Sequence, residues 1–405
     1  MHTISKLLLG IITLNTFFKI GKYLLRLACV GLATLIPKRK DIWVFGGWFG
    51  KAFSDNPKYM YQYLVANHSI DITSIWIGKD SELVRQLKEQ GVNAHYHNSL
   101  AGIYYQLIAK VVFVSHSISS DLNPWYVSFN TKRIQLWHGI PLKKIGFDDH
   151  VFTSKDALIQ RFPKLFSLLT NDRYDLITSA GEACTKLFSS AFNLPLNKIV
   201  PTGFPRNDVF FATQDQYKAK TVYKVIYMPT FRGDIDSEFD LFDLFGFDAV
   251  EIDKVFDVEG IELTIRTHPA NKPTNSIISK INNSKNIKLS TVSDVYEEIT
   301  SYDCLITDYS SIMFDFSLSK KDILFAPFDL EKYLKDDRKL YFSYSDILGG
   351  IYFNNWPELI TGIIESKNSS SKFKPNAFIN SFHDDLPVGI NSFSQRVYNI
   401  TKSLL

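Results

Sequence analysis

Short apolar runs alternate with polar turns and helix-like periods along most of the 405-residue chain. In the first half, runs that predict strands lie at 42–45, 72–77, 111–115, 134–137, 175–179 and 199–202. In the second half they lie at 223–227, 261–265, 305–307 and 323–325. Helix-like periods follow several of these runs, for example at 59–66, 81–90 and 182–192. Strands that alternate with helices in this way predict an α/β fold with parallel sheets.

A mostly polar stretch at 213–221 lacks an apolar period and separates the two similar halves. The chain is long enough for two α/β domains, so we predict one domain over 41–212 and a second over 222–390. Residues 391–405 predict a C-terminal helix that could pack on either domain.

Residues 1–40 differ from the rest of the chain, because they contain seven basic residues and no acidic one. The longest uncharged runs, 7–18 and 27–37, are shorter than the roughly 18–20 residues that a membrane-spanning helix needs. A spanning segment is therefore not expected here.

The same segment has a helical face of polar and basic residues, formed by Asn15, Lys19, Lys22 and Arg26. This pattern is typical of an amphipathic helix lying on an anionic membrane, with the basic residues 38–40 as a second contact. A helix packed on the protein's own core explains the pattern as well. A secretory signal fits less well, because charges are spread through the apolar part and no clear cleavage pattern follows.

Composition narrows the functional classes. A hydrophobic content of 45% indicates a globular protein, and a net charge of +3 without a broad basic region argues against nucleic-acid binding. The three cysteines, Cys29, Cys184 and Cys304, are far apart, which suggests a reducing compartment without a disulfide framework or zinc site. His95 and His97 lack a third metal ligand, so we interpret them as surface histidines. We predict neither a metal nor a cofactor. The chain has no Walker lysine motif, Gly-x-Gly-x-x-Gly or Gly-x-Ser-x-Gly.

The polar turn after the predicted strand at 305–307 is the first candidate binding site. Thr307, Asp308, Ser310 and Ser311 precede a helical apolar pattern that begins at Ile312. A helix that starts in this way directs unpaired N–H groups and hydroxyls at one point, and its dipole favours an anion. An ordinary helix cap explains the same residues. Three other polar stretches, each also after a strand, favour the anion site.

His138 directly follows the predicted strand at 134–137 and is flanked by Gly139 and Pro141. Its imidazole should therefore project from a sharp turn. Because a histidine titrates near neutral pH, His138 is a candidate base for deprotonating an alcohol. A structural histidine bonded to a backbone carbonyl is the alternative.

Arg266 and His268 stand two residues apart after another predicted strand, so both side chains point to the same side if the strand continues. A guanidinium and an imidazole there suit a diphosphate whose bond to phosphorus is breaking. A polar strand face turned to solvent is the alternative. Thr230 and Arg232, which follow the predicted strand at 223–227, are further candidates for binding phosphate.

Seven short motifs occur in order between about residues 45 and 345. They are Asn56-Pro-Lys-Tyr59, Trp137-His-Gly-Ile-Pro-Leu-Lys143, Thr202-Gly-Phe-Pro-Arg-Asn-Asp208, Met228-Pro-Thr-Phe-Arg232, Arg266-Thr-His-Pro269, Thr307-Asp-Tyr-Ser-Ser-Ile312 with Phe314-Asp-Phe316, and Pro327-Phe-Asp-Leu-Glu-Lys-Tyr333. In these motifs the chain resembles the CDP-glycerol:poly(glycerophosphate) glycerophosphotransferase family, the teichoic-acid primases and polymerases of bacterial cell envelopes. Ile140 stands where that family often has a small polar residue.

The resemblance implies two Rossmann-like domains in a GT-B arrangement, with the acceptor domain at 41–212 and the CDP-alditol donor domain at 222–390. It implies a peripheral protein at the cytoplasmic side of the cell membrane that contacts the anionic lipid surface through residues 1–40. The implied reaction transfers glycerol phosphate from CDP-glycerol to a hydroxyl of a lipid-linked saccharide or polyol-phosphate acceptor and releases CMP, in teichoic-acid or capsule-type synthesis. CDP-ribitol as donor, and a GT-B glycosyltransferase with a nucleotide-sugar donor, stay open as alternatives, as does a homo-oligomer.

The resemblance also implies the roles of individual residues. His138 matches the family's proposed base, and His268 matches a histidine near the diphosphate. The substrate-binding residues expected on both grounds are Thr230, Arg232, Arg266, Thr307, Asp308, Ser310 and Ser311.

Overall fold

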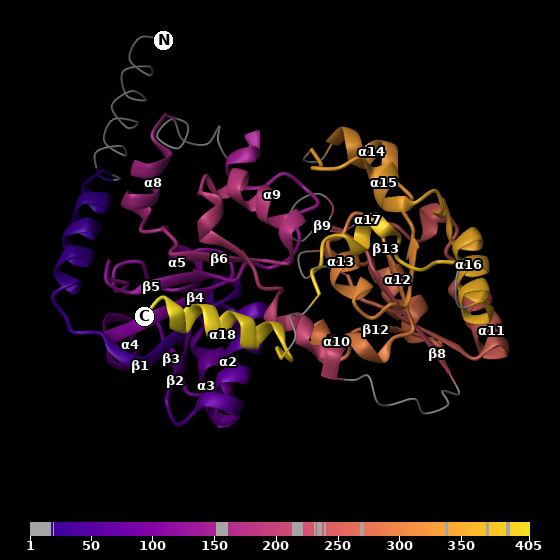
Figure 1. Cartoon of the computed structure of the whole chain (residues 1–405). Helices are drawn as coiled ribbons and strands as arrows, with labels where there is room; N and C mark the ends of the chain where they lie inside the picture. The colour runs from indigo at the N-terminus through magenta and orange to yellow at the C-terminus, as the bar shows by residue number, and fades with distance from the viewer. Residues whose placement is uncertain are drawn as a thin grey trace, which may run out of the picture.

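The computed structural model describes residues 18, 20–150, 161–212, 222–230, 232, 237–238, 240–267, 271–336, 339–369, 372–385 and 389–405. Within these residues two parallel sheets lie side by side, one in each half of the chain (Figure 1). The predicted α/β fold with parallel sheets is confirmed. The boundary predicted at 213–221 lies outside the described residues.

The first sheet has the strand order β3-β2-β1-β4-β5-β6-β7. Its strands are β1 Arg39–Phe45, β2 Thr73–Gly78, β3 Ala94–Tyr96, β4 Ala109–Val114, β5 Lys132–Gln135, β6 Leu176–Ser179 and β7 Ile199–Pro201. The second sheet has the order β12-β10-β8-β13-β14. Its strands are β8 Tyr223–Met228, β10 Ile261–Ile265, β12 Ile287–Leu289, β13 Cys304–Thr307 and β14 Asp322–Phe325; β9 Ser237–Glu238 and β11 Asn271–Lys272 pair separately.

The helices follow the alternation that the sequence predicts. In the first half they are α2 Asp55–His68, α3 Ser81–Glu89, α4 Leu100–Ile108, α5 Ile118–Asp121, α8 Pro163–Thr170, α9 Glu182–Phe192 and α10 Val209–Ala212. In the second half they are α11 Ala249–Glu259, α12 Asn275–Asn282, α13 Ile312–Ser317, α14 Leu330–Asp336, α15 Tyr344–Leu348, α16 Trp356–Asn368, α17 Ala377–Asn380 and α18 Phe393–Ser403.

The strand order reverses direction between β1 and β4 in the first sheet and between β8 and β13 in the second. In open parallel sheets, ligands bind outside the carboxyl ends of the strands at such a switch point. The turns that follow β1, β4, β8 and β13 are therefore the places where this topology favours a functional site, and the turn after β5 lies next to them because β5 pairs with β4.

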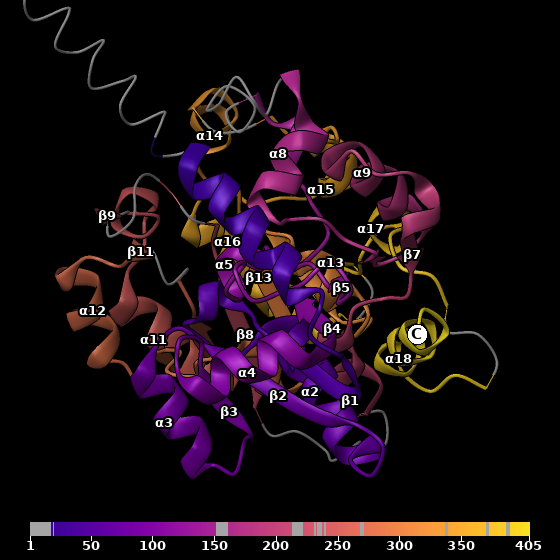
Figure 2. The same ribbon diagram turned by 90° about the vertical axis from the view of Figure 1, so that its left-hand side faces the viewer.

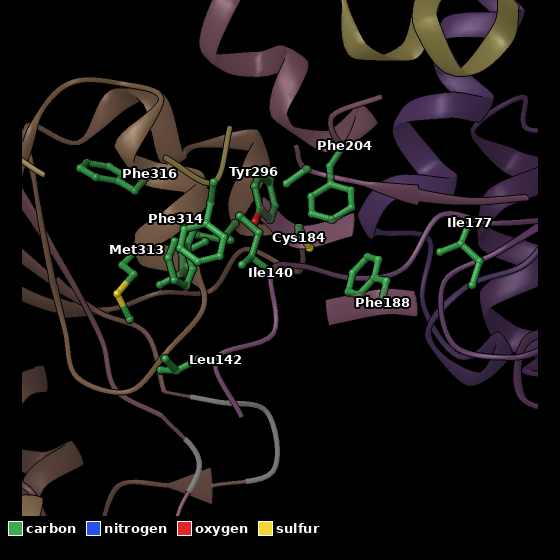
Figure 3. Close-up of a cluster of buried hydrophobic side chains, with 14 of the residues drawn as sticks. Ile140, Leu142, Ile177, Cys184, Phe188, Phe204, Tyr296, Met313, Phe314 and Phe316 are labelled. Atoms are coloured by element: carbon green, nitrogen blue, oxygen red, sulfur yellow. The ribbon is translucent and has the colours of Figure 1, made fainter. Parts of the chain in front are cut away.

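The largest apolar core is shared by the two sheets. Alternate residues of β1 face opposite sides: Trp43 and Phe45 pack with α2 and α3, whereas Ile42 and Val44 enter the shared core. Residues of β8 and β13 also enter it. Figure 3 shows Ile140 between the aromatic residues of the two halves, and its side chain is 1% exposed. Ile140 therefore has a packing role.

The C-terminal helix α18 returns from the second half of the chain to the first (Figure 1). Asp208 accepts the backbone N–H groups of Phe393 (2.6 Å) and Ser394 (3.1 Å) at the start of the helix. Val397 is buried in the cluster that contains Trp43. The structure thus decides which half this helix packs on, a point that the sequence left open.

Residues 20–33 form a helix that lies beside α8 (Figure 2). Arg26 is 8% exposed, and its Nη1 donates to the carbonyls of Leu169 (3.3 Å) and Thr170 (3.0 Å) at the end of α8. Lys38 donates to the carbonyls of Ala33 and Leu107. Arg26 and Lys38 therefore supply donors to helix-end carbonyls within the protein, as a helix packed on the protein's own core predicts, and contact of residues 1–40 with a membrane stays a prediction.

The exposed residues of this helix include Leu24, Leu25 and Leu32, and Leu35 just after its end is 78% exposed. Lys22, which belongs to the predicted polar face, is exposed as well. Asn15 and Lys19, which belong to the predicted polar face, lie outside the described residues. Across the described part of the chain, no helix has both the length and the apolar content to cross a membrane.

Candidate functional site

The turn after β5 carries His138, as the sequence predicts. Gln135 shapes it, since its Oε1 accepts the N–H of Trp137 (3.0 Å) and its Nε2 donates to the carbonyl of His116 (2.7 Å). Trp137 has φ 56° and Gly139 has φ 139°, so two residues of the turn leave the usual backbone regions. Glycine tolerates this backbone, whereas Trp137 is strained, and such strain is typical of functional sites.

The ring of His138 is oriented by one hydrogen bond. Its Nδ1 lies 2.9 Å from the carbonyl oxygen of Ser115, at the end of the neighbouring strand β4. Because a carbonyl only accepts, Nδ1 carries the proton, and Nε2 of the neutral ring keeps a lone pair. Burial, and then the nearby His116, lower the pKa of His138 to about 4. The imidazole is therefore neutral near pH 7 and able to accept a proton.

A second imidazole stacks on His138. The ring of His116 lies 4.3 Å from that of His138 with an interplanar angle of 12°. His116 Nδ1 lies 2.9 Å from Ser115 Oγ, and its backbone N–H donates to Asp121 Oδ2 (2.8 Å). Burial lowers the pKa of His116 as well. Sequence reasoning missed this stacked pair, although the position of His116 directly after a predicted strand was an available signal.

The predicted donor-binding turn follows β13 and divides into two parts. Thr307 and Asp308 are fully buried. Thr307 Oγ1 donates to the carbonyl of Met228 (2.8 Å), while Asp308 Oδ1 accepts from the N–H (2.8 Å) and hydroxyl (2.6 Å) of Thr230. These three residues thus join the ends of β13 and β8 to each other.

Ser310 and Ser311 lie further along the same turn, toward the first half of the chain. A Cβ placed on Gly139 would lie 3.3 Å from Ser311 Oγ, so this serine faces the His138 turn. Ser311 does not use its side chain to cap α13 in the described structure. The ordinary-cap interpretation therefore does not account for Ser311, and its hydroxyl is placed where the two halves meet.

The two predicted phosphate-binding arginines bond within the protein. Arg232 Nη2 donates to Asp308 Oδ2 (2.7 Å), and its Nε donates to Asp329 Oδ2 (2.8 Å). Arg266 donates to Ser290 Oγ (3.0 Å) and to the carbonyls of Val292 and Ser293. A substrate phosphate would have to compete with these acceptors, so their role as ligands stays a prediction.

His268, the second predicted catalytic histidine, lies outside the described residues. Among the side chains that the structure does describe, no group of three or more His, Cys, Asp or Glu residues could hold a metal ion. His95 bonds to Asn93 Oδ1 (3.1 Å) and packs on the ring of Tyr105.

Sequence reasoning also missed a buried ion cluster behind the His138 turn. Arg206 bonds to Asp55 of α2 and to Asp315 of α13, and both carboxylates are buried. Asp315 interrupts the apolar run that begins at Ile312, which was the available signal. A charge inside such a run is rare unless it is paired.

The chain is similar to two bacterial proteins. It is 30% identical over 325 residues to the teichoic acid poly(glycerol phosphate) polymerase of Staphylococcus epidermidis, a match that covers 76% of this chain and 43% of that protein. It is 28% identical over 359 residues to the teichoic acid glycerol-phosphate transferase of Staphylococcus aureus, covering 82% of this chain and 86% of that protein. The chain thus spans less than half of the first relative and most of the second.

The fold has a solved counterpart in the wall teichoic acid polymerase TagF, with a TM-score of 0.71 and 23% sequence identity. The superposition covers 97% of this chain and 99% of the TagF chain. The arrangement of two Rossmann-like halves is therefore shared, as predicted. The family description CDP-Glycerol:Poly(glycerophosphate) glycerophosphotransferase matches residues 29–398. This match covers most of the chain and confirms the resemblance, and the protein belongs to that family.

Proposed function

We propose that the protein transfers glycerol phosphate from CDP-glycerol to a hydroxyl of a membrane-linked acceptor and releases CMP. The observation that carries the proposal is the state of His138: the Nδ1 proton is donated to the carbonyl of Ser115, and Nε2 is left as a proton acceptor on the turn after β5, the strand that pairs with the switch strand β4. The names of the two relatives, a glycerol-phosphate polymerase and a glycerol-phosphate transferase, support the same reaction.

In the proposed reaction the acceptor oxygen attacks the phosphorus that bears glycerol. His138 Nε2 takes the hydroxyl proton as the new O–P bond forms. The bond between this phosphorus and the bridging oxygen breaks, and its electron pair leaves with CMP. A diphosphate next to the imidazole stabilises the imidazolium, so the pKa of His138 in the substrate complex rises from about 4 toward neutrality.

The donor diphosphate is proposed to lie at the β13 turn, with Ser310 and Ser311 as ligands; Ser311 faces the His138 turn. His268, Arg232 and Arg266 complete the proposed set of phosphate ligands, after Arg232 and Arg266 exchange some of their present acceptors. Thr230 and Asp308 support the turn through their hydrogen bonds to each other, and Thr307 supports it through its bond to the carbonyl of Met228. Donor charge is thereby placed opposite the base, which is the geometry that an in-line transfer needs.

The acceptor is proposed to be a lipid-linked saccharide or polyol phosphate, reached from the cytoplasmic face of the membrane. The exposed leucines of helix 20–33, together with Leu35 just after it, support peripheral attachment, because exposed apolar side chains beside a helix can enter the lipid interface. Replacing Leu24 and Leu35 together by serine is expected to reduce binding to anionic vesicles in a sedimentation assay. Ile70→Ser is the matched control, since Ile70 is 98% exposed but lies outside this helix. Equal binding by all three proteins would refute the attachment.

The reaction is tested by CMP release from CDP-glycerol and, separately, from CDP-ribitol. The purified protein receives a lipid-linked disaccharide acceptor or one primed with glycerol phosphate. Acceptor-dependent CMP from CDP-glycerol is expected. Release only from CDP-ribitol would assign the other alditol, and neither binding nor turnover with both donors would favour transfer of a sugar from a nucleotide sugar.

A further inference from the structure

Arg206 connects three segments that are far apart in the sequence. It lies in the short helix η4 (Pro205–Asp208), after the last strand of the first sheet, and is 6% exposed. Its Nη1 donates to Asp55 Oδ1 (2.8 Å) and to the carbonyl oxygen of His138 (2.9 Å). Its Nη2 donates to Asp315 Oδ2 (2.5 Å) in α13. One guanidinium thus bonds to the base-bearing turn and to the helix that follows the donor-side turn.

The bonds around Arg206 extend the link between the two halves. Asp315 also accepts the hydroxyl of Tyr296 (2.6 Å) and Asn207 Nδ2 (2.8 Å). Nearby, Lys58 of α2 bonds to Asp294 Oδ2 (2.8 Å) in the second half. Residues of three motifs that have no role in the proposed chemistry, 56–59, 202–208 and 314–316, therefore meet in one buried polar cluster.

Stability alone does not explain such a cluster. A buried ion pair recovers little more than the cost of removing its charges from water, and apolar residues of similar size often serve stability better. What the guanidinium adds is geometry, because its planar fork fixes the directions of several hydrogen bonds at once. A Cβ placed on Gly139 would lie 2.9 Å from Arg206 Nη2 and 3.3 Å from Ser311 Oγ. The guanidinium therefore contacts the base turn, and Ser311 of the donor turn lies next to both.

We propose that Arg206 is a positioning residue of the transfer reaction: it holds the His138 turn on one side and α13 on the other, and so sets the distance between the base and the donor phosphate. This inference rests on the proposed function, in which His138 is the base. Arg206 itself touches neither substrate, and it acts through the His138 carbonyl and the Asp315 carboxylate.

The test is Arg206→Lys in the full-length protein, with kcat, KM and the Kd for CDP-glycerol measured together. Lysine keeps the charge but loses the fork, so the two halves should misalign slightly. A displacement on the order of 1 Å costs about 100-fold in rate, so kcat is expected to fall by about 10- to 100-fold. The donor Kd should change less than about threefold, because the donor site is proposed to lie on the second half.

Arg133→Lys is the matched control. Arg133 is also buried, but it donates to the carbonyl of Ser128 (2.8 Å) and to Asn171 Oδ1 (2.9 Å), away from the site. It should lose stability while kcat of the folded protein stays within about twofold. If Arg206→Lys keeps the wild-type kcat, or if both variants lose kcat equally, Arg206 has only a structural role.

Two further measurements cover other outcomes. If Arg206→Lys does not fold, Tyr296→Phe decides: it removes the 2.6 Å bond to Asp315 and should lower kcat by about 3- to 10-fold, and an unchanged kcat overturns the inference. Hydrogen exchange needs no substrate, so it separates this inference from the proposed reaction. Arg206→Lys should raise exchange in peptides 136–142 and 310–316 together, whereas a rise confined to 203–209 overturns the coupling.

Discussion

Replacing Asp315 by asparagine removes a negative charge from the middle of the molecule and keeps the shape of the side chain. Asp315 Oδ2 accepts from Arg206 and Tyr296, and Oδ1 accepts from Asn207. The guanidinium of Arg206 can only donate, so the new amide must keep its oxygen toward Arg206 and turn its NH2 group toward Asn207. Asn207 Nδ2 then loses its acceptor unless the Asn207 amide turns over, and in either case Asp315→Asn removes part of the charge that neutralises Arg206.

The expected loss is about 3 kcal/mol in the free energy of unfolding. Removing one partner of a buried ion pair costs roughly 3–5 kcal/mol, and the lower end applies because Arg206 keeps Asp55. Urea unfolding followed by fluorescence measures the change as a lower midpoint with an unchanged slope. Asp243→Asn is the control, since its ion pair with Lys280 is exposed and is worth less than about 1 kcal/mol. A loss below about 0.5 kcal/mol for Asp315→Asn would refute the assignment of a tightly bonded buried charge.

Three other predictions concern the buried histidines and Gly139. The value of kcat/KM should stay constant from about pH 8 to 6 and fall at lower pH, because burial lowers the pKa of His138 to about 4 in the free enzyme. A decrease of kcat/KM that begins near pH 7 would contradict this. The free energy of unfolding should fall as pH drops from about 6.5 toward 4, because burial lowers the pKa values of His116, His138 and His383, so that the unfolded chain binds more protons than the folded one. Urea midpoints that do not change over this range would be inconsistent with neutral buried rings. Gly139→Ala should lower kcat by about tenfold or more, since its Cβ would lie 2.9 Å from Arg206 Nη2. Gly91→Ala is the control and should leave kcat unchanged, because Gly91 is also at positive φ but has open space around it; equal kcat values for the two variants would argue against a close approach of Gly139 and Arg206.

Much of the fold could be predicted because buried strands and amphipathic helices leave strong periodic patterns. The predicted strand at 261–265 and the predicted helix at 182–192 have the bounds of β10 and α9. The strands β3 and β12 were missed because each has three residues with a polar one, His95 or Lys288, in the middle, whereas the equally short edge strand β7 begins with two apolar residues.

The candidate site was predictable only where local sequence determines geometry. His138 lies in a sharp turn because Gly139 follows it, and both residues are adjacent in the sequence. The partners of Arg206 were not predictable, because Asp315 lies 109 residues away and only the packing of two sheets brings them together. The bond of Arg232 to Asp329 was not predictable either, because the two residues are 97 positions apart. The sequence had suggested the N–H donors of Arg232 as phosphate ligands.

The role of His138 as general base is tested most directly by His138→Ala, with CMP release and CDP-glycerol binding measured on the same preparation. Loss of the base should lower turnover by about 10²- to 10⁴-fold, while the Kd for CDP-glycerol stays within about threefold of the wild-type value. His95→Ala serves as the control, because His95 lies near the surface on another strand and should keep wild-type turnover. Retained turnover in His138→Ala, or loss of donor binding as large as the loss of turnover, would contradict the assignment.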